Sequence, residues 1–291
     1  MRITFQKELD EGTKGLRTTY DIAFFGQCID DRGKHSIDLT KSASRFSHLI
    51  NYVPEDFVLV SGADRFRADA SKAFCAKFPG TSVLLDATTL DVPELLLLCR
   101  HYFSDNATKH IGFIYVEPEG YKSKLSASFS PFHPIPGFTP ELSSTRVGRL
   151  LAFLGFEPTR LHRVLSAEEG SNIKAFSVAF GVPSYRASWE MRAMMPNADV
   201  LNEQNAAEDV HYVGANNPLA AYRLIEQTSK TVSDKSERLI LAPLGTKPAS
   251  IGAVLFAALH PNVRIMFDFP LRAADRTFGV GRIHHYGVSP N

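Results

Sequence analysis

The stretch Leu239-Ile-Leu-Ala-Pro-Leu-Gly245 decides the fold, because it reads as a short apolar strand that ends in a tight turn. A helical pattern over Pro248–His260 follows it, and then a second apolar run, Val263-Arg-Ile-Met-Phe-Asp268. This order is typical of a crossover in a parallel sheet, whose strands are covered on both faces and are therefore apolar without alternation. The segment predicts an α/β fold.

Similar apolar runs and helical patterns alternate along the rest of the chain. We predict strands over Asp21–Phe25, Phe57–Val60, Val83–Asp86, Ile111–Val116, Leu150–Leu154, Ile173–Phe180, Val210–Val213, Leu239–Pro243 and Val263–Phe267. We predict helices over Ser42–Asn51, Ala63–Phe78, Val92–Phe103, Thr159–Glu169, Tyr185–Met195, Pro218–Thr231 and Pro248–His260. The alternation indicates a doubly wound protein with largely parallel sheets.

A proline-rich interval interrupts this alternation after residue 116. It contains Pro118, Pro131, Pro134, Pro136 and Pro140, a composition typical of a linker or lid. We therefore predict two Rossmann-like halves, residues 1–120 and 146–291, joined by a linker or lid at 121–145. A single large mixed sheet that carries this interval as an insertion is the alternative.

Composition excludes several classes of protein. The 291 residues include 32 Lys and Arg against 31 Asp and Glu, a balance that disfavours indiscriminate binding to nucleic acid or to an anionic membrane. Three cysteines without C-x-x-C spacing favour a reducing compartment, so we expect a cytoplasmic protein. No apolar run reaches the ~18–20 residues that cross a bilayer, and the first residues are too polar for a signal peptide.

The turn after Leu239–Pro243 is the clearest candidate ligand site. Ligands of open parallel sheets bind beyond the carboxyl ends of the strands, where the next helix presents free N–H groups. Here Gly245 permits a tight turn, Thr246 and Ser250 offer hydroxyls, and Lys247 brings a positive charge. We predict that these residues bind a phosphate group. The alternative is that Thr246 caps an ordinary helix and Lys247 is solvated.

Two further segments supply candidate phosphate ligands. Gly62 and Arg65 follow the predicted strand Phe57–Val60, where a glycine turn and a guanidinium suit an anion. We also expect Arg276 to complete the anion site at the Thr246 turn, unless the C-terminal segment forms an ordinary edge strand. The neighbouring His284 and His285 would face opposite sides of such a strand, which disfavours them as joint metal ligands. We predict no metal site.

The sequence lacks the familiar catalytic motifs, such as H-E-x-x-H and G-x-S-x-G. Three acids at predicted strand ends, Asp86, Asp268 and Glu117, are the candidates for acid-base chemistry. A dinucleotide-binding G-x-G-x-x-G does not follow the first predicted strand, so no cofactor is identified and a nucleotide is the expected ligand.

The strand that leads into Gly245-Thr246-Lys247 and a helix of small residues resembles the ligand-binding turn of the CARF and SAVED families. These are Rossmann-like sensors of cyclic or linear oligonucleotides in bacterial antiviral defence. The resemblance implies a nucleotide sensor or adaptor that acts through an effector protein, although these sensors usually carry a fused effector for which no span remains. A nucleotide- or nucleic-acid-processing enzyme, such as a metal-dependent hydrolase or a transferase, and a structural subunit of a defence complex are the alternatives.

The expected partners are an effector protein or another subunit of a complex, with a homodimer as a further arrangement. One predicted helix carries Trp189, Met191, Met194 and Met195. A methionine-rich face is adaptable enough to dock another protein, but we expect these side chains to pack in the core.

Overall fold

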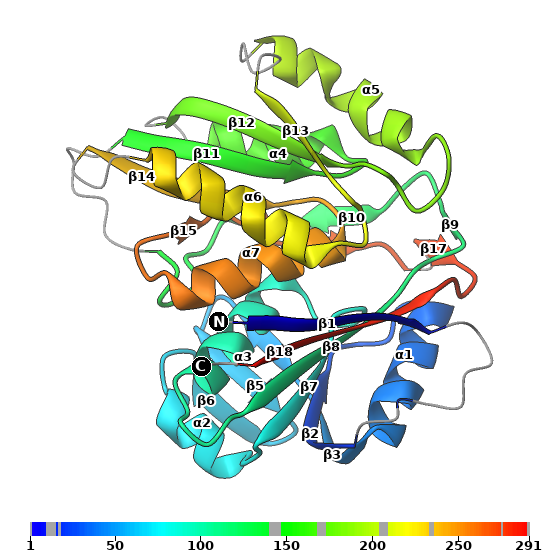
Figure 1. Ribbon diagram of the computed structural model, residues 1–291, viewed down its shortest axis with the longest axis vertical. Coiled ribbons are helices and arrows are strands. Elements are labelled where there is room, and N and C mark those ends of the chain that lie inside the picture. The colour runs from blue at the N-terminus through cyan, green and yellow to red at the C-terminus, as the bar shows by residue number, and fades with distance from the viewer. Residues whose placement is uncertain are drawn as a thin grey trace. The chain divides into compact units, whose positions relative to one another are not determined.

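A computed structural model describes residues 2–9, 16, 19–139, 147–167, 173–203, 209–232, 236–274 and 276–289. It shows an α/β protein of two compact units (Figure 1). The first unit contains Met1–Phe129 and Pro270–Asn291, and the second contains Ser130–Phe269. The predicted α/β class with parallel sheets is confirmed.

The division between the units differs from the expected one. The chain leaves the first unit after Phe129 and returns to it at Pro270, so the second unit is an insertion. Residues 270–291 therefore belong with the N-terminal part of the chain and not with a C-terminal half. Of the predicted linker, residues 121–129 lie in the first unit and 130–139 in the second, while residues 140–145 lie outside the described residues.

The first unit is built on a six-stranded sheet with the order β1-β18-β8-β7-β2-β3. Its strands are β1 (Arg2–Leu9), β2 (Tyr20–Phe25), β3 (Ser44–Leu49), β7 (Ser82–Asp86), β8 (His110–Val116) and β18 (Ile283–Ser289). Strands β3, β2, β7 and β8 are parallel, whereas β18 is antiparallel to both β8 and β1. The final strand is thus an inner strand, so the alternative of an ordinary edge strand for the C-terminal segment is wrong.

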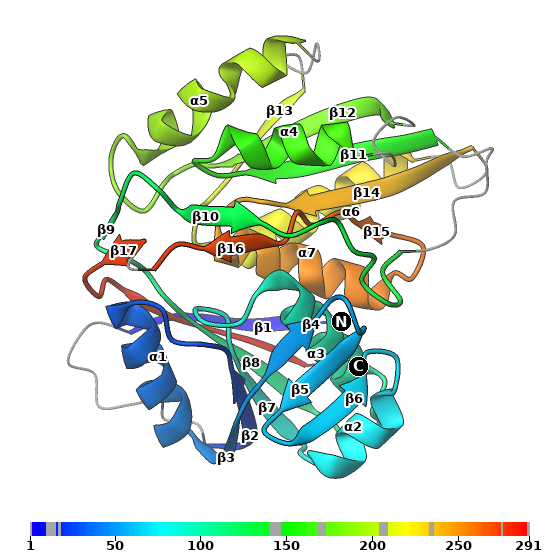
Figure 2. The ribbon, with the colours of Figure 1, turned by 180° about the vertical axis from the view of Figure 1, so that it is seen from behind.

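Helices cover both faces of this sheet. Helix α1 (Asp31–Ser42) lies on one side, and α2 (Ser71–Lys77) and α3 (Val92–Phe103) lie on the other (Figures 1 and 2). The ring of Phe24 in β2 contacts Phe74 in α2, Phe78 directly after α2, and Tyr102 in α3, all of them buried. Aromatic packing thus fixes α2 and α3 against the sheet.

One predicted helix of the first unit is wrong, and another is right only in its second part. Within Ser42–Asn51, residues Ser44–Leu49 form β3, whereas Ala63–Phe78 contains a hairpin strand followed by α2. That hairpin sheet contains β4 (Asn51–Val53), β5 (Val58–Ser61) and β6 (Asp64–Arg67). Helix α1 was not predicted because its buried face is made largely of Gly33, Ser36 and Thr40, which do not form an apolar stripe.

The second unit contains a five-stranded parallel sheet with the order β13-β12-β11-β14-β15. Its strands are β11 (Val147–Leu154), β12 (Ile173–Gly181), β13 (Val210–Val213), β14 (Glu237–Pro243) and β15 (Arg264–Ile265). The chain begins in the middle, moves outward through β12 and β13, and then crosses to β14 on the other side of β11. This is the strand order of a Rossmann-like half, with its switch point between β11 and β14.

Four helices flank this sheet: α4 (Pro158–Ser166), α5 (Trp189–Glu203), α6 (Pro218–Thr231) and α7 (Lys247–Leu259). Helices α6 and α7 cover one face, and α4 and α5 lie on the opposite side (Figures 1 and 2). Leu161, Val164 and Val200 enter the core from α4 and α5. The expected core packing of the methionines is wrong for two of them, because Met191 is 49% and Met195 is 68% exposed, whereas Met194 packs against the core.

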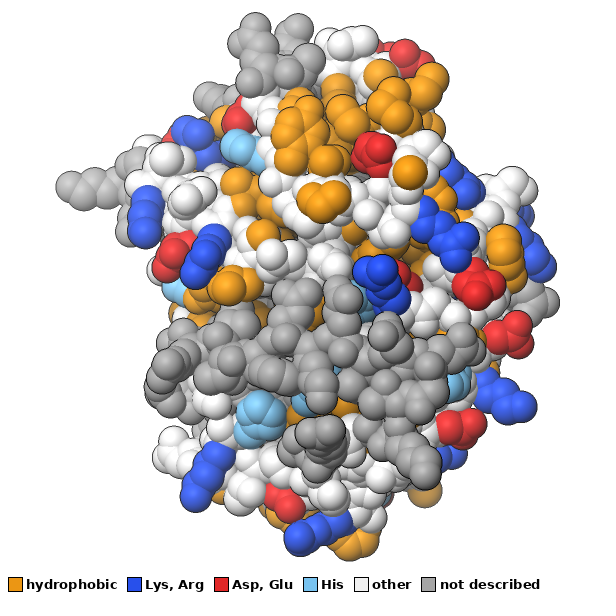
Figure 3. All heavy atoms as spheres, turned by 45° about the vertical axis from the view of Figure 1, so that its right-hand side comes forward, with side chains coloured by type: hydrophobic (Ala, Val, Ile, Leu, Met, Phe, Trp, Pro, Cys, Tyr) orange, Lys and Arg blue, Asp and Glu red, His pale blue; other side chains and the backbone are white. Residues whose placement is uncertain are grey.

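Hydrophobic side chains are visible on the surface in the upper part of the view in Figure 3, which belongs to the second unit. None of the helices within the described ranges has the length and apolar character required to cross a bilayer.

Candidate functional site

The predicted turn of the second unit is an ordinary helix start. Thr246 is the N-cap of α7: its Oγ1 accepts a hydrogen bond from the Ala249 N–H at 3.4 Å and donates one to the Ala215 carbonyl at 2.9 Å. The alternative of a capping threonine is therefore confirmed. Lys247 is the first residue of α7 and is partly buried.

Ser250 does not face a ligand at this turn. Its side chain is buried, and its Oγ lies 3.2 Å from the Thr246 carbonyl oxygen and 3.4 Å from that of Pro243. A Cβ on Gly245 would lie 3.1 Å from the Leu154 carbonyl oxygen, so Gly245 lets the chain after β14 approach the end of β11 closely. Backbone atoms therefore fill the space between the ends of β11 and β14, and the Thr246 and Ser250 hydroxyls donate to backbone carbonyls.

Asp268 follows β15 and is held by an arginine. Its carboxylate is completely buried and accepts hydrogen bonds from Arg160 Nε at 2.9 Å and Arg160 Nη2 at 2.6 Å. Arg160 also donates to the Leu244 carbonyl at 3.1 Å. An enclosed, doubly hydrogen-bonded carboxylate of this kind holds the loops together and is not placed to exchange protons with a substrate.

Gly62 and Arg65 do not sit at a strand-to-helix turn. Gly62, with φ of 59°, forms the tight turn of the β5–β6 hairpin, in which Ser61 pairs with Asp64. Arg65 forms an ion pair with Asp56 at 2.6 Å, and both side chains are more than half exposed. The prediction of a phosphate-binding turn before a helix is wrong here, because the chain continues as a strand.

Asp86 ends β7 and is completely buried. It accepts hydrogen bonds from Ser36 Oγ at 2.5 Å, Thr89 Oγ1 at 2.6 Å and the Thr88 N–H at 2.9 Å. Burial raises the pKa of the Asp86 carboxyl, although these hydrogen bonds oppose the shift. Asp86 thus ties the end of β7 to α1 and is out of reach of solvent.

A different group of charged side chains lies at the carboxyl ends of β2 and β8 in the first unit. Asp30 is the N-cap of α1 and accepts a hydrogen bond from the Gly33 N–H at 2.8 Å. Arg32, which is 3% exposed, donates from Nε to Asp30 at 3.0 Å and to Thr277 Oγ1 at 3.2 Å. Its Nη1 donates to the Val116 carbonyl at 3.3 Å. Arg32 thus connects the start of α1, the end of β8 and β17 (Thr277–Phe278).

Two more arginines belong to this group. Arg272, in β16 (Pro270–Arg272), donates to the carbonyls of Thr89 and Leu90 and pairs with Asp91 at 3.0 Å. Arg276 follows in the same segment, and its Nε is buried without a hydrogen-bond partner. No side chain among the described residues forms an ion pair with Arg276. We call Arg32, Arg272 and Arg276 the arginine cluster.

The charges of the arginine cluster are not balanced by its neighbours. Asp30 compensates Arg32 and Asp91 compensates Arg272, while Arg276 lacks such a partner among the described residues. Burial, together with the positive charges of Arg272 and Arg32, lowers the pKa of the Arg276 guanidinium to about 10. A buried N–H of a guanidinium without an acceptor is costly, so the cluster favours an added anion near Arg276.

Nearby carboxyl groups do not remove this imbalance. The pKa of Asp30 is lowered, because the effect of burial is outweighed by the charge of Arg32 and by the hydrogen bonds from Thr277 and the Gly33 N–H. Its negative charge is paired with Arg32. Burial and the neighbouring Asp91 raise the pKa of Glu94, which accepts hydrogen bonds from the backbone N–H groups of Tyr52 and Asp91.

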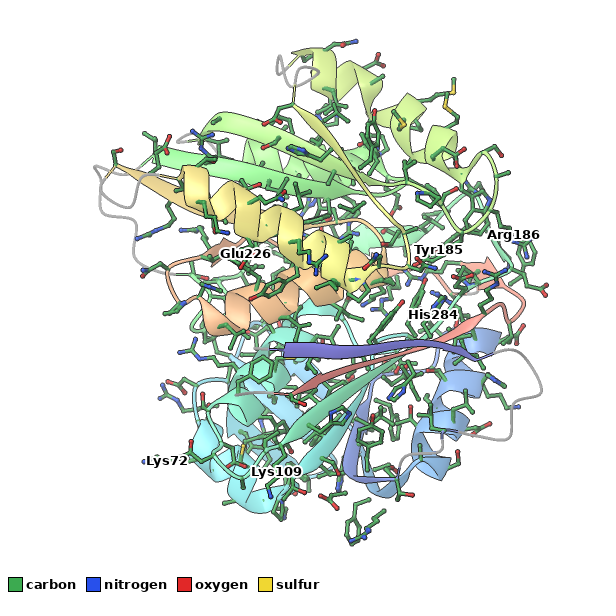
Figure 4. All side chains as sticks on the ribbon, in the orientation of Figure 1. Lys72, Lys109, Tyr185, Arg186, Glu226 and His284 are labelled. Carbon is green, nitrogen blue, oxygen red and sulfur yellow. The ribbon has the colours of Figure 1, made fainter. Side chains whose placement is uncertain are left out.

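Glu117 directly follows β8 and is paired with a histidine. Its Oε1 lies 2.6 Å from Nε2 of His284, near the start of β18 (Figure 4). The His284 side chain is completely buried, whereas that of Glu117 is 10% exposed. His284 and His285 do face different partners, as expected for adjacent strand residues, because His285 contacts the Tyr20 hydroxyl at 2.6 Å.

The predicted site residues are divided between the two units. Arg276 and Glu117 belong to the first unit, whereas Gly245–Ser250 and Asp268 belong to the second. Sequence reasoning did not find Asp30, Arg32, Arg272 or the role of His284. The only local signal was Asp30 two residues before Arg32, which is typical of a helix N-cap.

Comparison with known proteins adds no family to this description. No protein-family model matches the chain, and a search of the curated proteins gives no match.

Proposed function

We propose that this protein senses a phosphate-bearing nucleotide, which it binds at the arginine cluster, and that it acts through a separate effector protein. The observation that carries the proposal is Arg276, whose Nε is buried and lacks a hydrogen-bond partner among the described residues. Phosphate oxygens suit guanidinium groups because they accept two parallel charge-assisted hydrogen bonds.

Two features favour an added phosphate. A phosphate group carries more acceptor oxygens and more negative charge than a carboxylate, which suits Arg276 because its Nε lacks a partner among the described residues and Arg32 and Arg272 add positive charge nearby. The site lies at the carboxyl ends of parallel strands, where ligands of open α/β sheets bind.

Calorimetry tests the binding step. Inorganic phosphate, AMP, ADP, ATP, GTP and cyclic di- and tri-adenylate are titrated into the native protein. We expect at least one nucleotide to bind, and Arg276→Met to weaken that binding roughly ten- to a hundredfold through loss of a charge-assisted hydrogen bond. Arg65→Met is the matched control, because it removes an arginine from an exposed ion pair in the hairpin. The proposal fails if none of these compounds binds, or if both variants bind equally well.

Thermal melting provides a second readout. Arg276→Met removes an uncompensated buried charge and keeps an apolar stem, so the melting temperature without ligand should stay the same or rise. The nucleotide should raise the melting temperature of the native protein but not that of Arg276→Met. A variant that melts several degrees lower would show that Arg276 is structural.

The effector step needs a separate experiment. We expect one protein to co-purify with the native chain only when the nucleotide is present, and to be lost with Arg276→Met. A partner that binds both proteins equally, with or without nucleotide, would favour the alternative of a structural subunit.

A further inference from the structure

Glu117 differs from the other two candidate acids in its access to solvent. Asp86 and Asp268 are completely buried, and both of their carboxylates are held by strong donors. Glu117 Oε1 accepts a hydrogen bond from His284, and no hydrogen bond to Oε2 is seen among the described residues. Because its side chain is 10% exposed, Glu117 alone among the three can meet a water molecule bound at the edge of the sheet.

His284 fixes the orientation of this carboxylate. Its ring is completely buried and lies nearly parallel to the rings of Tyr115 and Tyr286. Nε2 faces Glu117, while Nδ1 is buried without a hydrogen-bond partner. Because a carboxylate oxygen accepts hydrogen bonds, Nε2 carries a proton and His284 donates it to Glu117 Oε1.

Arg32 links Glu117 to the arginine cluster. Its Nη1 contacts the carbonyl of Val116, the residue before Glu117, while its Nε contacts Thr277, the residue after Arg276. A single guanidinium group is only a few ångströms wide, so Val116 and Thr277 lie close together. Glu117 and Arg276 thus flank the same edge of the first unit.

We propose that the protein hydrolyses a phosphoanhydride bond of its nucleotide, with Glu117 as the general base and His284 as its positioning residue. This inference rests on the proposed nucleotide site. Glu117 takes a proton from water, the water oxygen forms a bond to phosphorus, and the bond from phosphorus to the bridging oxygen breaks with its electron pair. The shortened nucleotide leaves with the bridging oxygen as an anion, the attacked phosphorus becomes inorganic phosphate that carries the water oxygen, and Glu117 then returns the proton to solvent.

The residues at this edge favour an anhydride over an ester. An alkoxide that leaves from an ester needs a proton, which arginine side chains supply poorly because they hold their protons tightly. A phosphate that leaves from an anhydride needs none, and guanidinium groups stabilise its charge. The expected substrates are therefore nucleoside di- and triphosphates.

Turnover is measured on the native protein with ATP, GTP, CTP and UTP in ¹⁸O-labelled water, with and without Mg²⁺. We expect product nucleotide by chromatography, with one ¹⁸O atom in the phosphate released. Calorimetry on the same samples separates the two proposals. Binding without turnover overturns this inference and leaves the nucleotide site standing, whereas absence of binding removes both.

Variants test the role of each side chain. Glu117→Gln should lower kcat by roughly a hundredfold or more, the usual effect of losing a general base, with the nucleotide dissociation constant changed by less than threefold. Glu119→Gln is the control, because Glu119 is an exposed acid two residues further on. If Glu117→Gln keeps its turnover, Glu117 is not the base.

Two substitutions of His284 separate positioning from packing. Gln can place an amide N–H where His284 has Nε2–H, whereas Leu fills space without a donor. We expect His284→Gln to retain most of kcat and His284→Leu to lose it, with nucleotide affinity unchanged in both. Equal activity of the two variants, or a parallel loss of affinity and kcat, would overturn the positioning role.

Discussion

Arg160 and Asp268 form a doubly hydrogen-bonded ion pair in which the carboxylate is completely buried and the guanidinium is 14% exposed. The arginine comes from the first turn of α4 and the acid from the segment after β15, 108 residues later. The guanidinium also lies 5.6 Å from the centre of the Phe267 ring. The Arg160 side chain thus joins the start of α4 to the segment after β15 in the second unit.

Arg160→Met should destabilise the protein by ~3–5 kcal/mol, because it leaves a buried carboxylate without its partner. The double variant Arg160→Met/Asp268→Leu should recover much of this loss, since it removes both charges. Unfolding in urea measures the difference. The exposed pair formed by Arg65 and Asp56 is the control, and Arg65→Met should cost less than ~1 kcal/mol. Equal effects of Arg160→Met and Arg65→Met would contradict the structural role.

Asp86→Ala should destabilise the first unit, because three donors from Ser36, Thr88 and Thr89 lose their acceptor in a dry environment. We expect a loss of ~2–3 kcal/mol in the free energy of unfolding. Ser36→Ala removes one of these donors and should cost ~1 kcal/mol. Urea denaturation checks both values, and a larger effect of Ser36→Ala than of Asp86→Ala would show that Asp86 does not organise the network.

His101 should make stability depend on pH. Its ring is completely buried, its Nδ1 lies 2.7 Å from Ser71 Oγ, and burial followed by the charge of Arg100 lowers its pKa to about 4. The unfolded chain protonates His101 near its usual pKa of ~6.5, whereas the folded protein does not, so stability falls as the pH drops from ~6.5 towards 4.

The difference between the pKa of His101 in the unfolded and the folded chain lowers the free energy of unfolding by roughly 3 kcal/mol at pH 4 relative to pH 7. Urea unfolding measured from pH 7 to pH 4 checks this value. The free energy of unfolding should fall by about 3 kcal/mol less for His101→Phe than for the native protein. His162→Gln, at an exposed histidine, should follow the native curve. If His101→Phe and the native protein show the same pH dependence, His101 titrates normally in the folded state.

Gly252→Ala should weaken the packing of α7 on α6. A Cβ at this position would lie 2.5 Å from the Pro218 carbonyl oxygen and 2.8 Å from Ala221 Cβ. The helices must therefore separate, at a cost of ~1–3 kcal/mol that outweighs the higher helix propensity of alanine. Thermal unfolding measures the change. A variant as stable as the native protein would show that α6 moves freely.

Local signals were sufficient for several helices. The predicted bounds of α3 and α6 agree with the structure because each helix has a strong start: a capping box formed by Asp91 and Glu94 for α3, and Asn217 followed by Pro218 for α6. The start of α7 was found within one residue from Thr246 and Pro248. Capping chemistry lies within a few residues, so it is visible in a sequence.

The error at β3 has a physical cause. Phe46, Leu49 and Ile50 are spaced by three and four residues, which mimics the buried stripe of a helix. In the structure Phe46 is 67% and Leu49 is 40% exposed on the edge strand of the sheet, whereas Ile50 is buried beyond the strand. Periodicity misleads where apolar residues are left on the surface.

The arginine cluster was beyond sequence reasoning for a different reason. Arg276 was predicted as an anion ligand, but its association with Arg32 depends on Thr277, which lies 245 residues from Arg32 along the chain. The position of Thr277 follows from the pairing of β17 with β9 (Gly120–Tyr121). Neither composition nor periodicity indicates that position.

The placement of β18 also sets an order of events during synthesis. Residues 130–269 leave the ribosome before residues 283–289, so every strand of the second unit is available while the sheet of the first unit still lacks its inner strand. Before β18 is synthesised, β1 has no neighbouring strand in the sheet of the first unit, and β8 is the edge strand of that sheet. A nascent chain that stalls before residue 283 therefore presents an open strand edge, the kind of surface that chaperones cover and that other chains can join.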